Sequence, residues 1–178
     1  KHPMDGVRFT KPVRAVDDIK CLTTDEQQKF MEAAKRSHNY AQYALILETG
    51  LRTGEVIGLT WDAIDWKART LTVNKTLEFR HKQKMWRAGP PKTQQSYRTI
   101  PLTSYAYDIL KQLYSQVSER KESELLNSTL EYMDRRTGET ASLCMRDLVF
   151  INWRTGEPAK NSSCDTHLYK LCDEAGIR

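Results

Sequence analysis

Apolar residues recur at helical spacing in several stretches of the chain. Before the first stretch, Thr23 stands three positions ahead of Glu26, a pattern typical of a capping box. Gly50 directly follows a second apolar stretch, and glycine is the residue that most often ends a helix. The helices expected from these patterns cover residues 23–36, 40–48, 53–58, 104–118 and 161–176.

Between the third and fourth of these helices the pattern changes to the alternation of strands. Thr70–Val73 alternates and is rich in β-branched residues, and residues 76–87 and 96–100 are expected to form a second and a third strand. Ala88–Thr93, which connects them, is full of turn residues. We therefore expect an α+β fold that is mainly helical and carries a small antiparallel three-stranded sheet with a protruding β-turn.

Three further segments complete the predicted organisation. Residues 1–20 are mixed and aperiodic, so they are expected to be an arm or interdomain linker, with one domain over residues 21–178. Residues 119–147 are polar and charged, and we expect an insertion or a long loop there. Leu148–Ile151 is a short apolar run and is expected to be a buried strand.

Composition excludes several classes of protein. The 178 residues are 39% hydrophobic with a mean hydropathy of −0.68, and no apolar run approaches the roughly 20 residues of a membrane span. The first 20 residues lack the apolar core of a signal peptide. The four cysteines form no Cys-x-x-Cys pair, which favours a reduced, cytoplasmic protein. The chain begins at Lys1 and ends at Arg178, and we expect both ends to be cuts within a longer protein.

The positive charge is concentrated in one stretch. The whole chain carries a formal net charge of +5, whereas residues 67–98 alone hold nine basic and one acidic side chain, a net charge of +8. Such a concentration on a folded element is typical of a protein that binds a polyanion, usually nucleic acid. The alternative is a solvated basic hairpin without a partner, and charge alone leaves both open.

The sharpest local motif is Glu48-Thr-Gly-Leu-Arg-Thr-Gly-Glu-Val-Ile-Gly-Leu-Thr-Trp61. One apolar helix ends at Gly50, Arg52 stands in the tight turn, and the next helix begins with Glu55 in its first turn. A guanidinium fixed between two helix ends can hold a phosphate through two hydrogen bonds, with Glu55 orienting it. The alternative is that Arg52 only pairs with Glu55 to stabilise the turn.

A second motif lies about 40 residues further on. Lys92 belongs to the stiff turn Gly89-Pro-Pro-Lys-Thr93, ahead of the run Tyr97-Arg-Thr-Ile-Pro-Leu102. A lysine at the tip of such a turn can reach into a groove and give a proton to a leaving oxygen. A loop lysine taken alone is usually just solvated.

The two motifs, in this order and with a short sheet between them, resemble the catalytic domain of tyrosine recombinases. The resemblance is best to the integrases of conjugative transposons and related phages, and it extends from about residue 20 to the end of the chain. The family resemblance implies that Arg52 clamps the scissile phosphate, that Lys92 is the general acid and that Glu55 supports Arg52. It implies a site-specific recombinase that cleaves and rejoins double-stranded DNA through a 3′-phosphotyrosine, for integration and excision of a mobile element. It implies no cofactor and no metal, and a homo-oligomer on DNA, a tetramer in the full-length protein.

The sequence departs from the family pattern in its second half. The family carries a His-x-x-Arg box and a tyrosine nucleophile, and neither is recognisable here. His167-Leu-Tyr-Lys170 has the spacing of the box but ends in lysine, so we assign no nucleophile. Residues 21–178 are thus expected to be the N-terminal part of the catalytic domain. The alternative function is that of a non-catalytic DNA-binding fragment or accessory factor.

Other side chains are candidates for DNA contacts or metal binding. Trp86 lies in the basic stretch and could stack on a base, whereas Cys164, His167 and Cys172 are expected to be buried groups rather than metal ligands. Candidate DNA contacts are Arg80, His81, Lys82, Lys84 and Arg87 on the basic hairpin, and Lys160 and Asn161 near a helix N-terminus.

Overall fold

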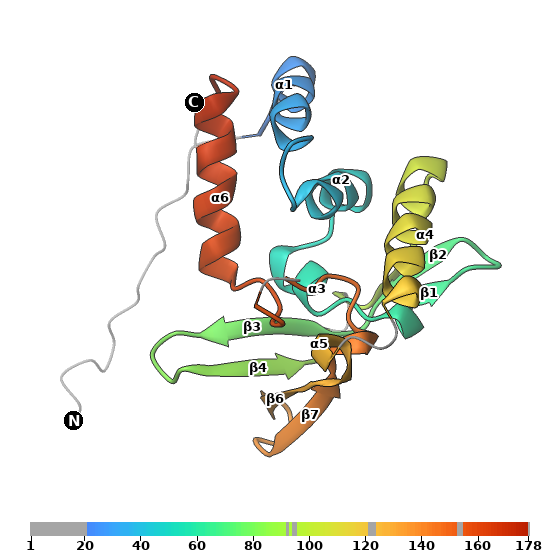
Figure 1. Cartoon of the computed structure of the whole chain (residues 1–178), viewed down its shortest axis with the longest axis vertical. Coiled ribbons are helices and arrows are strands. Elements are labelled where there is room, and N and C mark those ends of the chain that lie inside the picture. The colour runs from blue at the N-terminus through green and yellow to red at the C-terminus, as the bar shows by residue number, and fades with distance from the viewer. Residues whose placement is uncertain (1–20, 92, 94–95, 121–123, 153–154, 178) are drawn as a thin grey trace, which may run out of the picture.

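The computed structural model describes residues 21–91, 93, 96–120, 124–152 and 155–177, so the predicted arm over residues 1–20 lies outside the described part. Figure 1 shows the arrangement of the elements. The helices are α1 (Thr24–Ala34), α2 (Tyr40–Thr49), α3 (Thr53–Ile57), α4 (Ser104–Glu119), α5 (Glu124–Asn127), α6 (Asn161–Glu174) and the 3-10 turns η2 (Trp61–Ala63) and η4 (Met145–Asp147). The strands are β1 (Ile64–Asp65), β2 (Thr70–Val73), β3 (Thr76–Arg80), β4 (Met85–Gly89), β5 (Arg98–Pro101), β6 (Thr129–Asp134) and β7 (Thr140–Cys144).

The helices follow the sequence pattern closely. All five expected helices form, and their ends lie within two residues of the predicted positions. The capping box before α1 is confirmed, because Thr23 N–H donates to Glu26 Oε2 at 2.8 Å and Glu26 N–H donates to Thr23 Oγ1 at 3.3 Å. Gly50 ends α2 with a φ of 64°, a left-handed conformation that glycine adopts without strain.

The expected three-stranded antiparallel sheet is confirmed, but with different members. β2 pairs with β1 on one side and with β5 on the other, so that Val73 lies opposite Arg98. The predicted single strand over residues 76–87 is wrong. This segment is the hairpin β3–β4, which belongs to a second sheet with the order β3-β4-β6-β7.

The expectation of a long loop over residues 119–147 is also wrong. β6 pairs with β4 in parallel, and β7 pairs with β6 antiparallel. In the turn between β6 and β7, Asp134 Oδ1 accepts the backbone N–H groups of Arg136 and Thr137. The predicted strand over Leu148–Ile151 is reduced to one isolated bridge, in which Leu148 pairs with Thr60. Leu148, Val149 and Phe150 are nevertheless buried.

Three apolar clusters hold these elements together. The first joins α2, α3, β2 and α4, the second lies under the four-stranded sheet, and the third joins α1, α2 and α6. Within α3, Val56 belongs to the first cluster and its neighbour Ile57 to the second. The short helix α3 is therefore fixed from two sides, and so is the turn that precedes it.

The lack of a side chain at Gly58 allows the end of α3 to lie close to β3. A Cβ on this residue would lie 2.8 Å from the backbone nitrogen of Leu77, which is too close for real atoms. The glycine therefore allows the C-terminal end of α3 to pack directly against the start of β3. Among the described residues, no helix has both the length and the apolar character needed to cross a bilayer.

Candidate functional site

Arg52 projects from the turn between α2 and α3. Its backbone is extended, with φ −75° and ψ 153°, and it occupies the N-cap position of α3. The Arg52 side chain is 69% exposed. A guanidinium carries five N–H donors in a planar fork, so this side chain presents fixed positive charge to a molecule outside the protein.

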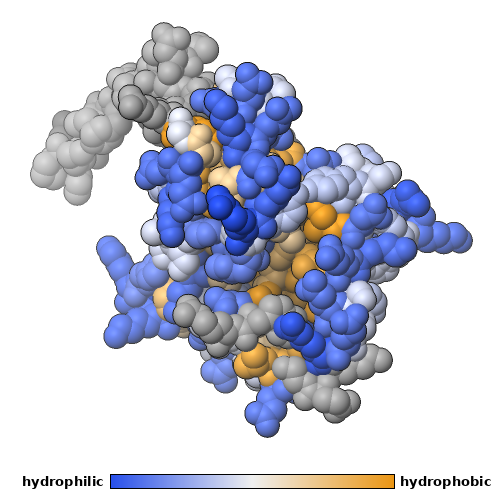
Figure 2. Space-filling model, turned by 45° about the horizontal axis from the view of Figure 1, so that its top comes forward, coloured by the Kyte–Doolittle hydropathy of each residue, from blue (hydrophilic) through white to orange (hydrophobic). Residues whose placement is uncertain are grey.

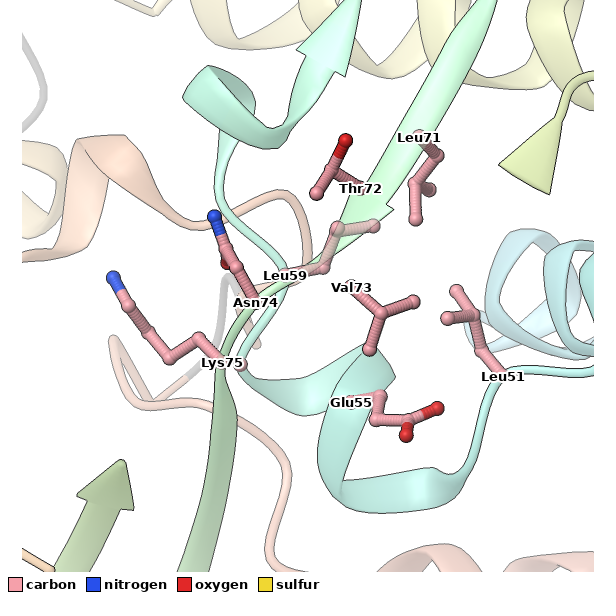
Figure 3. A pocket seen from close by; sticks show the side chains of 9 residues that line it. Leu51, Glu55, Leu59, Leu71, Thr72, Val73, Asn74 and Lys75 are labelled. Carbon is pink, nitrogen blue, oxygen red and sulfur yellow. The ribbon is translucent and has the colours of Figure 1, made fainter. Parts of the chain in front are cut away.

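Glu55 is the acidic partner behind Arg52. Its side chain is only 2% exposed, and Figure 3 shows it on α3 beside the apolar side chains of Leu51 and Val73. One carboxylate oxygen accepts the Arg52 backbone N–H at 2.8 Å, and the other accepts Nη1 of the Arg52 guanidinium at 2.9 Å. Glu55 therefore fixes both the backbone and the side chain of Arg52.

A second arginine, Arg98 at the start of β5, completes the cluster. Its Nη1 donates to Glu55 Oε1 at 3.1 Å, and its Nη2 donates to Glu55 Oε2 at 2.9 Å. The sequence pattern placed Arg98 only in a strand, because the pairing of β2 with β5 that brings it to Glu55 is not visible locally. The buried carboxylate thus lies between two guanidinium groups.

The charge state of Glu55 follows from these partners. Burial acts to raise the pKa of its carboxyl, but the hydrogen bonds from Arg98 and Arg52 outweigh burial and lower the pKa below its ordinary value of 4.5. Glu55 is therefore ionised at neutral pH, and the cluster of Arg52, Glu55 and Arg98 carries a net charge of +1.

The protein leaves no room for a small-molecule ligand beside Glu55. The cavity beside Glu55 has a volume of about 10 Å³, room for a single water molecule. Figure 2 shows that the surface of the molecule is mostly hydrophilic on the side drawn there, with apolar side chains gathered in its hollows. Within the part of the chain that the structure describes, no group of three or more His, Cys, Asp or Glu side chains is placed to hold a metal ion.

Lys92, the second expected active residue, lies outside the described residues. Its position in the chain follows β4 and precedes β5, which begins at Arg98. The two ends of this connection are therefore anchored on the two different sheets.

The candidate DNA contacts of the hairpin differ in their exposure to solvent. His81, Lys82 and Lys84 are exposed in the turn between β3 and β4. Arg80 pairs with Glu78 at 2.7 Å, and Arg87 is half-buried, with an Nε that has no hydrogen-bond partner among the described residues. The exposed turn is thus the part of the hairpin that is most open to an external anion.

Lys160 and Asn161 join the start of α6 to the end of β3. Asn161 Oδ1 accepts the backbone N–H of Phe79 at 3.2 Å, and Lys160 Nζ lies 4.2 Å from the centre of the Phe79 ring. His81 reinforces this junction, because its Nε2 lies 2.9 Å from Ser162 Oγ. The candidate contacts at the start of α6 therefore lie directly beside the hairpin.

Two further candidate side chains, Trp86 and His167, make contacts with other side chains of the protein. Trp86 is 5% exposed and packs edge-on against Phe79 at 5.3 Å, so the hypothesis that it stacks on bases is not supported by its position. His167 binds Tyr43, whose hydroxyl lies 2.8 Å from Nδ1. This contact joins α6 to α2.

Comparisons with known proteins show the family of this chain. The model of the phage integrase family matches residues 20–178. A XerC-like tyrosine recombinase of Caldanaerobacter subterraneus subsp. tengcongensis is 29% identical over 132 residues, which cover 68% of this chain and 34% of the relative. The prophage integrase IntR of Escherichia coli K12 is 30% identical over 131 residues, which cover 73% of this chain and 30% of the relative.

Solved structures show the same fold at lower sequence identity. The Tn1549 transposon integrase, solved in complex with circular intermediate DNA, superposes with a TM-score of 0.65 at 20% identity, over 89% of this chain and 47% of that chain. The XerA recombinase superposes with a TM-score of 0.57 at 19% identity, over 95% of this chain and 47% of that chain. The present chain spans about a third of the length of the curated relatives and about half of these solved chains.

Proposed function

Because this chain belongs to the phage integrase family, we propose that it forms part of the catalytic domain of a site-specific tyrosine recombinase. The observation that carries the proposal is the arrangement of Arg52 and Glu55. The Arg52 guanidinium is 69% exposed, while the carboxylate that orients it is 2% exposed. A fixed and exposed arginine on a basic surface suits the phosphate of a nucleic-acid backbone.

The proposed reaction is a transesterification at a DNA phosphodiester. A tyrosine oxygen attacks the phosphorus, the bond to the 5′-oxygen breaks, and a 3′-phosphotyrosine forms. Arg52 binds the non-bridging oxygens and stabilises the charge that develops in the transition state. The phosphodiester energy is kept in the new bond, so rejoining needs no cofactor. We assign the nucleophile to no residue of this chain.

Lys92 is the proposed general acid. The departing 5′-oxygen takes up one proton, and the Lys92 ammonium supplies it. The sequence supports this role because Lys92 stands in the connection that leads from β4 to the strand carrying Arg98. Glu55 acts on neither bond and serves to position Arg52.

The proposed partner is double-stranded DNA, held mainly through its backbone. Backbone contacts come from the basic region formed by Arg80, His81, Lys82, Lys84, Arg87, Lys160 and Asn161. Exchange between two duplexes breaks four strands, so we propose a tetramer of the full-length protein on DNA. Such a protein would act at the bacterial nucleoid in the cytoplasm, in the integration and excision of a mobile element.

The second candidate is a non-catalytic DNA-binding fragment or accessory factor. The observation that favours it is the number of hairpin cations, which would bind DNA whether or not strand cleavage follows. Both functions predict an affinity for DNA that falls with salt, and they differ in the role of Arg52.

The deciding experiment traps the covalent intermediate. The full-length protein is incubated with a nicked duplex made from the junction DNA of its own mobile element, so that the cleaved fragment diffuses away and the phosphotyrosine accumulates. We expect Arg52→Lys to lower the amount of trapped complex by about 100- to 1,000-fold and to leave DNA affinity nearly unchanged. Arg36→Lys, at an exposed position between α1 and α2, is the matched control. Trapping by the Arg52 variant at the wild-type rate would favour the accessory factor.

A further inference from the structure

Arg98 makes contacts on both sides of the turn that carries Arg52. Its guanidinium donates to both oxygens of Glu55 on α3, and Nη2 also donates to the carbonyl oxygen of Gly50 at 3.3 Å. Nη1 donates in addition to the carbonyl oxygen of Ser96 at 3.3 Å. Arg98 therefore ties together the end of α2, the first turn of α3 and the start of β5, and Arg52 lies between the first two of these points.

The sheet fixes the position of Arg98 itself. Arg98 lies opposite Val73 in the pairing of β5 with β2, and Val73 is one of the apolar side chains beside Glu55. The Arg98 side chain is 29% exposed, against 69% for that of Arg52. Arg98 is thus the inner arginine of the pair, and Arg52 is the outer arginine that an external phosphate meets.

The charges of the cluster explain why two arginines are needed. Ionised Glu55 and Arg52 alone would form a neutral pair, and the carboxylate would compete with a phosphate for the guanidinium donors. Arg98 occupies both carboxylate oxygens from the other side. Glu55 then holds Arg52 through one guanidinium N–H and the backbone N–H, and the cluster keeps a net charge of +1.

We propose that Arg98 is a positioning residue for Arg52 and that it acts through Glu55. This inference rests on the proposed function, since it concerns how the phosphate-binding arginine is held. The Arg98 guanidinium is engaged by Glu55 and by the carbonyl oxygens of Gly50 and Ser96, so we assign it no role on the phosphate or the leaving oxygen. Arg98 keeps Glu55 ionised and binds both of its carboxylate oxygens. The Arg52 guanidinium is therefore held in position before DNA binds.

The test compares cleavage rate with DNA affinity in the full-length protein. Single-turnover formation of the covalent complex is measured at saturating nicked DNA for wild type, Arg98→Met, Arg98→Lys and Glu55→Gln, with Arg36→Met as the matched control. We expect Arg98→Met to slow cleavage by about 10- to 100-fold, because misplacing a catalytic group by a fraction of an ångström has effects of this size. Its dissociation constant for DNA should stay within about threefold of wild type, because Arg98 is the inner arginine, with a side chain 29% exposed against 69% for that of Arg52.

The double variant Arg98→Met with Glu55→Gln separates positioning from general stability. If Arg98 acts through Glu55, the double variant should cleave at about the rate of Glu55→Gln alone, because the shared interaction is already broken. Arg98→Lys should recover only part of the rate, since an ammonium cannot make the two parallel hydrogen bonds. If Arg98→Met does not fold, the rate of Arg98→Lys and its combination with Glu55→Gln decide the question.

Two results would overturn the proposal. One is an Arg98→Met or Arg98→Lys variant that cleaves at the wild-type rate. The other is a double variant in which the two effects simply multiply, since Arg98 would then act independently of Glu55. A wild-type protein that forms no covalent complex would instead refute the proposed function, and the positioning role with it, so the two failures are distinguishable.

Discussion

Glu55 and Arg98 are 43 positions apart in the chain, yet they form a two-point ion pair, with N···O distances of 3.1 and 2.9 Å. The Glu55 side chain is 2% exposed and the Arg98 side chain 29% exposed, so the pair is shielded from solvent. It joins the turn that carries Arg52 to the three-stranded sheet. The position of the outer arginine is therefore set by tertiary structure as much as by its own turn.

Removing the charge of Glu55 should destabilise the fold. Glu55→Gln keeps the shape of the side chain but replaces an ionised acceptor that binds two guanidinium groups. We expect a decrease of about 1–3 kcal/mol in the free energy of unfolding, measured by urea denaturation at pH 7. Glu32→Gln is the control, because Glu32 pairs with Lys35 on an exposed surface and its removal should not change stability measurably. Equal stability of wild type and Glu55→Gln would show that the pair contributes nothing net.

The close approach of α3 to β3 should make Gly58 intolerant of a side chain. A Cβ there would lie 2.8 Å from Leu77 N and 3.0 Å from Thr76 C, and backbone atoms cannot move aside cheaply. We expect Gly58→Ala to cost about 1–3 kcal/mol in the free energy of unfolding. Gly54→Ala, within α3 itself, is the matched control, because its Cβ would lie 3.5 Å from Leu77 O, an ordinary contact. Gly54→Ala should be neutral or slightly stabilising, and a similar decrease in both variants would contradict this account.

The sequence predicted the features that depend on residues close together in the chain. The helix from Thr24 was visible from Thr23 and Glu26, and the end of α2 was visible from Gly50, because caps are local signals. The same holds for the pairing of Arg52 with Glu55, three residues apart on a turn that begins a helix. Each of these residues interacts with a partner only a few positions away in the sequence.

What the sequence did not predict depends on pairing between distant segments. Trp86 stands among cations in the sequence, which suggested stacking on a base, but β3–β4 alternates, and Leu77, Trp86 and Ala88 face the second core. The strands β6 and β7 lie in a polar and charged stretch, and β6 joins β4 in parallel, so no turn between neighbouring strands indicates that pairing. Arg98 was missed for the same reason, since only the pairing of β2 with β5 brings it to Glu55.

Acid should loosen the contact between α6 and α2. Tyr43 donates to Nδ1 of neutral His167, and burial raises the pKa of Tyr43 to about 12, so its hydroxyl keeps the proton. Burial, together with the charges of His38 and Lys170, lowers the pKa of His167 below its ordinary value of 6.5. A lowered histidine pKa means that the stabilisation is complete above pH 6.5 and disappears as the pH falls from there toward the folded pKa.

The measurement is the melting temperature between pH 8 and pH 5. Wild type should lose stability below pH 6.5, and His167→Gln should show a flatter profile, because glutamine can accept from Tyr43 but does not titrate. His81→Gln is the control, because His81 contacts Ser162 at the start of α6 and takes no part in the contact with Tyr43. Parallel profiles for wild type and His167→Gln would show that another group causes the acid sensitivity.

The basic hairpin turn should set the salt dependence of DNA binding. Lys82 is exposed between β3 and β4, and removing one phosphate-binding cation lowers the slope of log K against log salt by about 0.9 for duplex DNA. We therefore expect Lys82→Gln to weaken binding similarly for all DNA sequences and to reduce this slope by about 1, measured by fluorescence anisotropy from about 50 to 200 mM salt. Lys111→Gln is the matched control, because Lys111 lies on α4 over the Tyr107 ring, away from the hairpin. A slope unchanged in Lys82→Gln but reduced in Lys111→Gln would move the DNA-binding surface from the hairpin to α4.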